Sequence, residues 1–238
     1  MLEWLLASID SSRIHSISDA ASWHGRLMVL AWGVAAPMSI ICARFFKITP
    51  RQNWPKELDN PTWWAIHWIG QSLVIVLTLI AVLLVFSDFQ PHTHARLGYV
   101  VTVGVIIQIV LGIFRGSKGG PTARHANGSL NGDHYDMTRW RRLFEHLHKT
   151  LGYVTVLLSA LTVFYGLWMV NASRFLFLAF VALWFTWITI FIYLQRRGWA
   201  VDTYQAIWGP DISHPGNQRK KPGWGMNRPH PIKKINGT

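Results

Sequence analysis

The sequence HTHARLGYV (residues 92–100) has a close copy further along the chain, HLHKTLGYV (residues 146–154). Each copy opens a long apolar stretch. In each, a glycine follows four residues after the second histidine, which places both on the same face of a helix. A further glycine, Gly112 or Gly166, lies deeper in each stretch. A histidine at the end of an apolar helix, with glycine on its face, suits an axial metal ligand beside a flat macrocycle.

Apolar residues gather into five blocks rather than being spread periodically. The blocks cover residues 27–46, 63–86, 95–114, 147–170 and 175–194. A helix needs about 20 apolar residues to cross a bilayer core of about 30 Å, and these blocks have that length with almost no charge inside. Buried core helices of a soluble protein are the alternative. We predict an all-α integral membrane protein with five transmembrane helices.

The basic residues lie mostly on one side of such a protein. Most of the 23 Lys and Arg residues fall in the loop after the first block, in loop 116–142 and in the tail. Cytoplasmic segments carry this excess, so we expect the N-terminus outside and the C-terminus cytoplasmic, in a plasma or inner membrane. The same bias accounts for the net charge of +12. We therefore expect membrane lipid as a partner and expect no nucleic acid.

Three segments follow from this pattern. Residues 1–21 are too short to span and are expected to form an interfacial segment, and residues 22–196 form the transmembrane domain. Residues 197–238 are a basic cytoplasmic tail, rich in Pro and Gly, with little expected fold of its own. The tail is a candidate docking site for a partner. The single cysteine, Cys42, excludes an internal disulfide and a Cys-x-x-Cys-His haem attachment site.

Four histidines at the ends of the blocks form two pairs. His24 and His94 open the first and third blocks, so both lie near the outer face. His67 and His148 open the second and fourth blocks, near the inner face. Two histidines that face each other across a bundle make a six-coordinate haem suited to electron transfer. We therefore predict that four of the helices form a haem-binding bundle with two non-covalent b haems.

Each copy of the repeat can supply only one ligand. Residues two apart on a helix point about 200° away from each other. We select His94 and His148, the second histidine of each copy, because they share a face with Gly98 and Gly152. These glycines would let a macrocycle approach the backbone; close helix–helix packing is the alternative.

Other polar side chains lie near the expected haem levels. The cationic ones are Arg26, Arg44, Arg96, Arg115 and Lys149. They could pair with haem propionates or an anionic substrate, or simply extend toward the membrane surface. Gln71 and Gln108 could bond a haem or link two helices.

These motifs resemble the cytochrome b561 family, in the form associated with DOMON domains. The resemblance lies in HGRLM (24–28), WWAIH (63–67), HARLG (94–98) and RRLF (141–144), the last followed by His148 and Gly152. It implies two b haems, one held by His24 with His94 and one by His67 with His148. Family members take electrons from ascorbate or a partner domain and deliver them to ferric iron, monodehydroascorbate or another acceptor. They commonly have six spans, and no DOMON segment is present here, so a separate electron partner is expected.

Three functions remain open at this point. The first is transmembrane electron transfer through two bis-histidine haems, as an ascorbate-, ferric- or quinone-reactive oxidoreductase or as a plain electron carrier. The second is a quinone-reactive cytochrome b anchor of a larger respiratory or dehydrogenase complex. The third is a haem-free structural subunit that docks partners. We assign no catalytic residue, and the electron donor and acceptor are expected to be a protein, ascorbate, a quinone or a ferric species.

Overall fold

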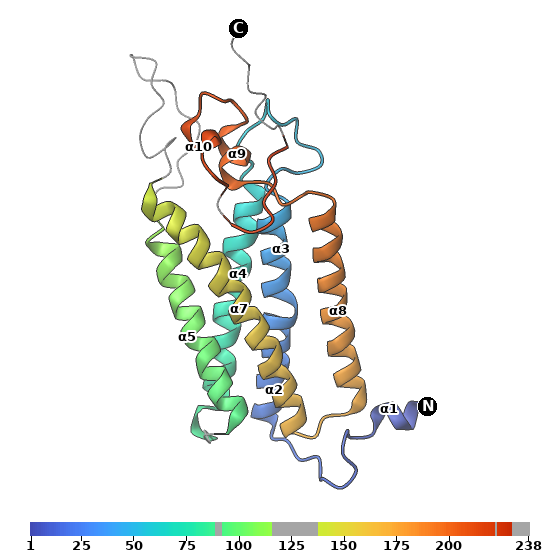
Figure 1. Ribbon diagram of the computed structural model, residues 1–238. Coiled ribbons are helices and arrows are strands. Elements are labelled where there is room, and N and C mark those ends of the chain that lie inside the picture. Colours follow the sequence, from blue (N-terminus) through green and yellow to red (C-terminus); the bar gives the residue numbers. More distant parts are fainter. Residues whose placement is uncertain (89–91, 116–137, 222, 230–238) are drawn as a thin grey trace.

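The protein is a bundle of long helices with smaller elements at both ends (Figure 1). The computed structural model describes residues 1–88, 92–115, 138–221 and 223–229. Five helical segments are long and apolar enough to cross a membrane. They are Asp19–Phe45, Thr62–Leu84, Thr93–Ile113, Arg139–Met169 and Arg174–Arg196. The chain is therefore an all-helical integral membrane protein, as predicted.

The first span is three helical elements joined end to end. They are α2 (Asp19–Met28), a π-helical segment η1 (Val29–Ala35) and α3 (Ala36–Phe45). The span begins earlier than its apolar block because the Ser18 side chain accepts a hydrogen bond from the Ala21 amide. Pro37 cannot donate to the Gly33 carbonyl. The indole of Trp187 on another helix donates to that carbonyl instead, at 2.8 Å.

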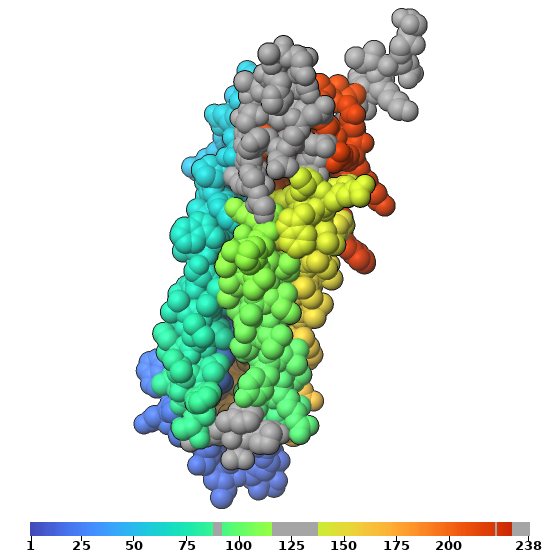
Figure 2. Space-filling view, turned by 90° about the vertical axis from the view of Figure 1, so that its left-hand side faces the viewer, coloured from blue at the N-terminus to red at the C-terminus, as the bar shows by residue number. Residues whose placement is uncertain are grey.

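Three of the remaining four spans complete two helix pairs that face each other, and α8 (Arg174–Arg196) lies beside them. The three are α4 (Thr62–Leu84), α5 (Thr93–Ile113) and α7 (Arg139–Met169). Helix α4 packs along the first span, and α5 packs along α7. Between the pairs lies an apolar cluster that includes Trp32, Val74 and Val101. Figure 2 shows the face where α4 and α5 lie next to each other, and α8 flanks the first span (Figure 1).

The N-terminal segment lies against the turn between α7 and α8. It contains a short helix, α1 (Leu2–Leu6). Asn171 in that turn has a positive φ of 50° and is buried. Its side-chain amide donates to the carbonyls of Asp10 and Arg13, at 2.9 and 2.7 Å. Two hydrogen bonds to a buried Asn thus anchor the segment at the end of the bundle that carries α1.

The C-terminal residues fold over the opposite end of the bundle, where the prediction of little structure is wrong. We name residues 199–229, of which 222 is not described, the C-terminal cover. It contains α9 (Thr203–Trp208) and α10 (Pro215–Gln218), and every residue of α9 is buried. Charge composition suggested disorder, but burial of α9 supplies apolar contacts that composition does not reveal. The expectation of an irregular loop over 116–142 concerns mainly residues 116–137, outside the described residues.

Candidate functional site

The histidine pair that is expected near the outer face, here called the outer pair, lies between the two helix pairs, near the starts of α2 and α5. The rings of His24 and His94 are 5.9 Å apart between centroids and 78° apart in plane. The Nδ1 atoms lie 2.8 and 2.9 Å from the carbonyl oxygens of Ala81 and Thr162. A carbonyl only accepts, so each Nδ1 carries the proton and each Nε2 keeps a free lone pair. This orientation by a backbone carbonyl is the one that metal-binding histidines usually show.

The inner pair lies at the other end of the bundle. His67 on α4 and His148 on α7 have ring centroids 6.1 Å apart and planes 83° apart. Phe144 stacks on His148 at 5.0 Å. The Nδ1 atoms of both rings are buried without a hydrogen bond of good geometry, although the Ser39 carbonyl interacts with His67. A buried imidazole without hydrogen bonds is costly, which favours a ligand at this pair.

Both separations fit a metal ion between the two rings. Two metal–nitrogen bonds of about 2.0–2.1 Å, plus half a ring on each side, span about 6 Å. In the parts of the chain that the structure describes, no three His, Cys, Asp or Glu side chains converge as a metal site. Two histidines alone do not complete a coordination sphere. A macrocycle that supplies the in-plane ligands would complete it, as haem does.

The glycines next to the histidines border open space. A Cβ added at Gly98 or Gly112 would meet nothing within 4 Å, and one at Gly152 would meet only the Gln108 amide at 3.7 Å. Glycines that serve helix packing look different here: a Cβ at Gly70 would lie 2.7 Å from the Cβ of Ser39. The positions of Gly98 and Gly152 thus agree with room for a ligand rather than with close helix contact.

Gly166 adds a detail at the outer pair. A Cβ at this position would lie 3.0 Å from Cε1 of His94. Because that contact is tighter than ordinary van der Waals distance, the ring of His94 occupies space that only glycine leaves free. The deeper glycine of the second copy therefore accommodates the histidine of the first copy.

A cavity of about 440 Å³ opens beside the inner pair. Such a volume is typical of sites for small molecules and cofactors. Its lining includes both inner histidines, Gly112, Gly152 and several tryptophans of α4. Cations outnumber acidic groups in the wall: these side chains are Arg44, Lys47, Arg115, Arg141, Lys149 and Glu145. The cavity combines an apolar interior with a cationic rim, a combination that suits a macrocycle with anionic substituents.

Comparison with known proteins supports this chemistry. The chain is 33% identical over 98 residues to ferric-chelate reductase 1 of Bos taurus, covering 39% of this chain and 16% of that protein. It is 26% identical over 144 residues to a cytochrome b561 and DOMON domain-containing protein of Arabidopsis thaliana, covering 60% of this chain and 27% of that protein. The chain is related to the cytochrome b561 proteins. This relationship implies a haem cofactor.

The similarity covers only part of this chain and a small part of each relative. A putative ferric-chelate reductase 1 of Xenopus laevis is 30% identical over 119 residues, covering 47% of this chain and 19% of that protein. The chain spans less than a third of the length of these curated relatives. No family model matches it, and no solved structure matches it.

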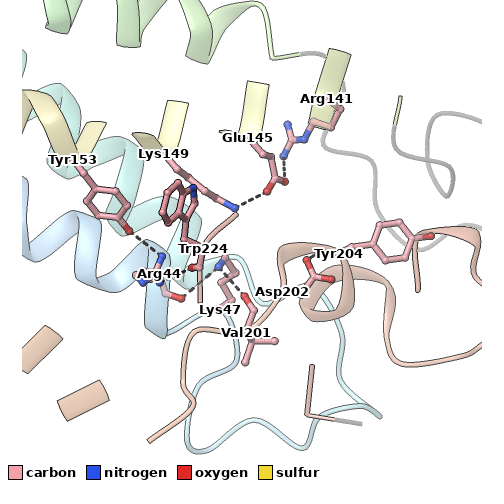
Figure 3. A network of polar contacts seen from close by, with 10 residues as sticks. All are labelled: Arg44, Lys47, Arg141, Glu145, Lys149, Tyr153, Val201, Asp202, Tyr204 and Trp224. Carbon is pink, nitrogen blue, oxygen red and sulfur yellow. Dashed lines mark hydrogen bonds and ion pairs between the residues drawn. The ribbon is translucent and has the colours of Figure 1, made fainter. Parts of the chain in front are cut away.

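Arg44 of this cytochrome b561 relative is held by protein atoms at the cavity wall. Its guanidinium donates to Gln195 Oε1 at 2.8 and 3.2 Å and to the Tyr153 hydroxyl at 3.1 Å. It also donates to the Trp224 carbonyl at 2.8 Å (Figure 3). These acceptors come from α7, α8 and the C-terminal cover, so Arg44 joins three parts of the fold. Its predicted contact with a haem propionate stays a prediction.

Lys149 is one of three charged side chains spaced four residues apart on α7. Its Nζ donates to Glu145 Oε2 at 2.7 Å, and Arg141 Nη2 lies 3.7 Å from the other oxygen. Glu145 is 3% exposed. Glu145 and Arg141 are not among the site residues predicted from the sequence, although the spacing of opposite charges by four residues indicates such a triad. With its one carboxylate shared by two cations, the triad leaves the rim of the cavity positive.

The other predicted polar residues take ordinary roles. Arg115 lies 4.0 Å above the ring of Trp64, and Arg26 lies 5.0 Å from the ring of Trp23. Arg96 is exposed at the outer end of α5. None of these contacts identifies a propionate partner, so the assignment of Arg96 to haem binding remains a prediction.

Gln71 and Gln108 link helices. Gln71 Nε2 donates to Ser39 Oγ on α3 at 2.6 Å. Gln108 Nε2 donates to the carbonyl of His148 on α7 at 3.1 Å. Both belong to the wall of the inner cavity. The structure thus shows the helix–helix alternative for both, and Gln108 also fixes the backbone that carries an inner histidine.

The first histidine of each repeat has another role or is exposed, although the ring of His92 lies 5.9 Å from the ring of His94 between centroids. The ring of His92 accepts a hydrogen bond from the Ala95 amide at 3.2 Å and caps α5. His146 is exposed on α7. The selection of the second histidine in each copy stays a prediction.

Lys47, just after α3, is a buried amine that is not among the site residues predicted from the sequence. It is 3% exposed, and its Nζ donates to the Val201 carbonyl at 2.9 Å (Figure 3). Burial, followed by repulsion from Lys149, lowers the pKa of this amine from 10.5 to about 7, against the opposing effect of Glu145 and Asp202. Neutral carbonyls replace the water that such a charge normally keeps.

Docking of the C-terminal cover on Lys47 should therefore depend on pH. Between about pH 7 and 10.5 the exposed amine holds its proton while the buried amine loses it, so the closed state gains up to about 1.4 kcal/mol per pH unit. Hydrogen exchange of α9 amides, corrected for the intrinsic rate, should slow as pH rises from 7 to 9. Lys47→Met should flatten this dependence, and Lys220→Met, at an exposed position, should not. Unchanged protection in the native chain would contradict the expectation.

Proposed function

We propose that the chain carries electrons across the membrane through two bis-histidine b haems. His24 and His94 hold the outer haem, and His67 and His148 hold the inner one. The observation that carries the proposal is the geometry of four histidines from four spans, in two facing pairs at 5.9 and 6.1 Å. Relatives of the cytochrome b561 type support it. When bound, a haem supplies a reversible one-electron couple.

The residues around each pair fix the histidines rather than provide reactive groups. The carbonyls of Ala81 and Thr162 hold the outer rings by Nδ1. At the inner pair, Phe144 stacks on His148, and Gln108 bonds its backbone. Two facing imidazoles would both ligate the iron of a bound haem and would leave no position for dioxygen, which favours electron transfer over oxygen chemistry.

The distribution of charge supports an orientation. The proposal places the C-terminal cover in the cytoplasm and the N-terminal segment outside, in a plasma or inner membrane. The inner site then faces the cytoplasm, and the outer site faces the exterior. The cationic side chains in the wall of the inner cavity provide counter-charges for propionates at the cytoplasmic end.

The electron partners are proposed from the relatives. Two of them are named ferric-chelate reductases, so we propose an oxidoreductase with a ferric species as the outer acceptor. The donor is a separate cytoplasmic reductant, such as ascorbate, a quinol or a protein. Between the two sites only electrons are transferred, and the protons that ascorbate or a quinol releases on oxidation pass to the cytoplasmic water, so we assign no described side chain as an acid or a base.

Haem content and redox titration test the proposal. Protein purified from haem-replete cells should contain two non-covalent b haems per chain, and its reduced-minus-oxidised spectrum should titrate in two steps. Vesicles loaded with ascorbate or with a quinol should then reduce an external ferric chelate. Protein without haem from such cells would instead support the structural docking subunit, and a single haem would restrict the proposal to one pair.

A further inference from the structure

The C-terminal cover contributes to the wall of the inner cavity. Thr203 and Met226 belong to the lining and are each 6% exposed. They lie on the side of the cavity where the helices end, beyond the inner histidines. The cover is therefore part of the site itself, and not only a neighbour of it.

Buried cations of the bundle attach the cover to the cavity rim. Lys47 donates to the Val201 carbonyl, and Arg44 donates to the Trp224 carbonyl (Figure 3). Arg44 and Lys47 are only 9% and 3% exposed. Both hydrogen bonds break when the cover is displaced, so these two residues join the cover to the rim of the cavity.

Two further contacts extend the cover across the bundle end. The Asp59 amide, in the loop between α3 and α4, donates to the Ala206 carbonyl at 3.3 Å. Gln195 at the end of α8 donates to the Gly225 carbonyl at 2.8 Å. The cover thus spans from the α3–α4 loop to α8, over the inner end of the bundle (Figure 1).

An internal ion pair holds the cover in shape. Arg228 Nε lies 2.8 Å from Asp202 Oδ2, and Asp202 is fully buried. The other two guanidinium nitrogens donate to the carbonyls of Asn217 and Gly216, at 2.6 and 3.0 Å. One arginine therefore joins the start of α9, α10 and the end of the cover, which makes the cover a single unit.

We propose that the C-terminal cover is a specificity element of the inner site: it closes the side of the inner cavity that Thr203 and Met226 line to water and to small water-soluble electron carriers. This inference rests on the proposed function, because the cavity is taken as the inner haem site. Exclusion of water also strengthens the interactions of the cationic rim. A soluble reductant then cannot enter the cavity from the side of the cover while the cover is closed, so a donor on that side passes its electrons across the surface of the cover.

Thiol labelling of the whole, haem-containing protein measures this closure. Cys42→Ser provides a background without the native cysteine. Met226→Cys places a thiol in the wall, and Trp224→Cys places one two residues away at a side chain that is 80% exposed. With a charged, membrane-impermeant maleimide, the thiol at 226 should react at least roughly tenfold more slowly than the thiol at 224, since its labelling requires local opening. Equal rates would overturn the proposal.

A second pair of variants tests the ion pair. Arg228→Ala leaves the Asp202 carboxylate buried without its partner and should accelerate labelling at position 226 roughly tenfold or more. Lys220→Ala, at an exposed position of the same segment, should leave the rate unchanged. Unchanged labelling in Arg228→Ala would contradict the role of the Arg228–Asp202 ion pair in closure. The haem spectrum of each variant is recorded separately, so a loss of the proposed haem function is distinguished from an open cover.

Discussion

His94→Ala should reduce the haem content from two to about one per chain and remove one of two redox transitions, since a bis-histidine site loses half its axial ligation. The remaining transition belongs to the inner pair. His24 cannot replace the lost ligand, because its own Nδ1 bonds the Ala81 carbonyl and only one ring nitrogen faces the site. Redox titration monitored in the haem absorption bands checks the result.

The reciprocal variant, His67→Ala, should remove the other transition and leave the outer pair intact. The two pairs lie at opposite ends of the bundle and share no ligand, so the two losses should be independent and should add in the double variant. A single variant that removes both haems would show that the sites are coupled through folding rather than separately loaded.

The first histidine of each repeat supplies matched controls. His92→Ala removes the cap of α5 and should cost about 1 kcal/mol of stability, with both haems retained. His146→Ala, at an exposed position, should change neither quantity. If His92→Ala removed a transition and His94→Ala did not, the choice of ligand within the repeat would be wrong.

The sequence predicts the spans well because a bilayer imposes a length on apolar blocks. All five blocks correspond to long helices in the structure. Alternation of helix direction then predicts which histidines share a membrane face, and the rings of the expected partners are indeed adjacent. The start of the first span was missed because Ser18, not the apolar pattern, fixes it through its capping bond.

The polar side chains of the inner site are less predictable because their partners are remote in sequence. Arg44 finds its acceptors on Tyr153, Gln195 and Trp224, between 109 and 180 residues away. A charge near a haem level suggests a propionate, but the sequence does not reveal protein acceptors that compete for it. Glu145 is the exception, since its spacing to Lys149 is visible in the sequence.

The fold of the C-terminal cover is also hard to predict from the sequence, because its contacts join remote residues. Its Pro, Gly and basic residues indicate a solvated tail with little fold of its own. The structure gives it a buried ion pair and two bonds to buried cations of the bundle. These contacts join residues that are distant in the sequence, so no local sequence pattern predicts them.

Truncation after Gly198 should therefore affect the inner haem selectively. The truncated chain loses the cavity wall at Thr203 and Met226 and the carbonyl acceptors of two buried cations. We expect loss of most of the inner haem, or a clear shift of its midpoint potential because solvent exposure tunes haem potentials. The outer transition should keep its potential, because its ligands lie at the other end of the bundle.

A shorter truncation separates this effect from the loss of tail charge. Removal of residues 230–238 takes away Lys233 and Lys234 and retains Arg228, so the ion pair with Asp202 is preserved. This control should keep both transitions. If truncation after Gly198 also kept both transitions, with unchanged potentials, the cover would be a docked tail without influence on the inner site. If only the longer truncation shifts the inner transition, the inner haem environment depends on the described part of the cover, as its buried contacts with Arg44 and Lys47 require.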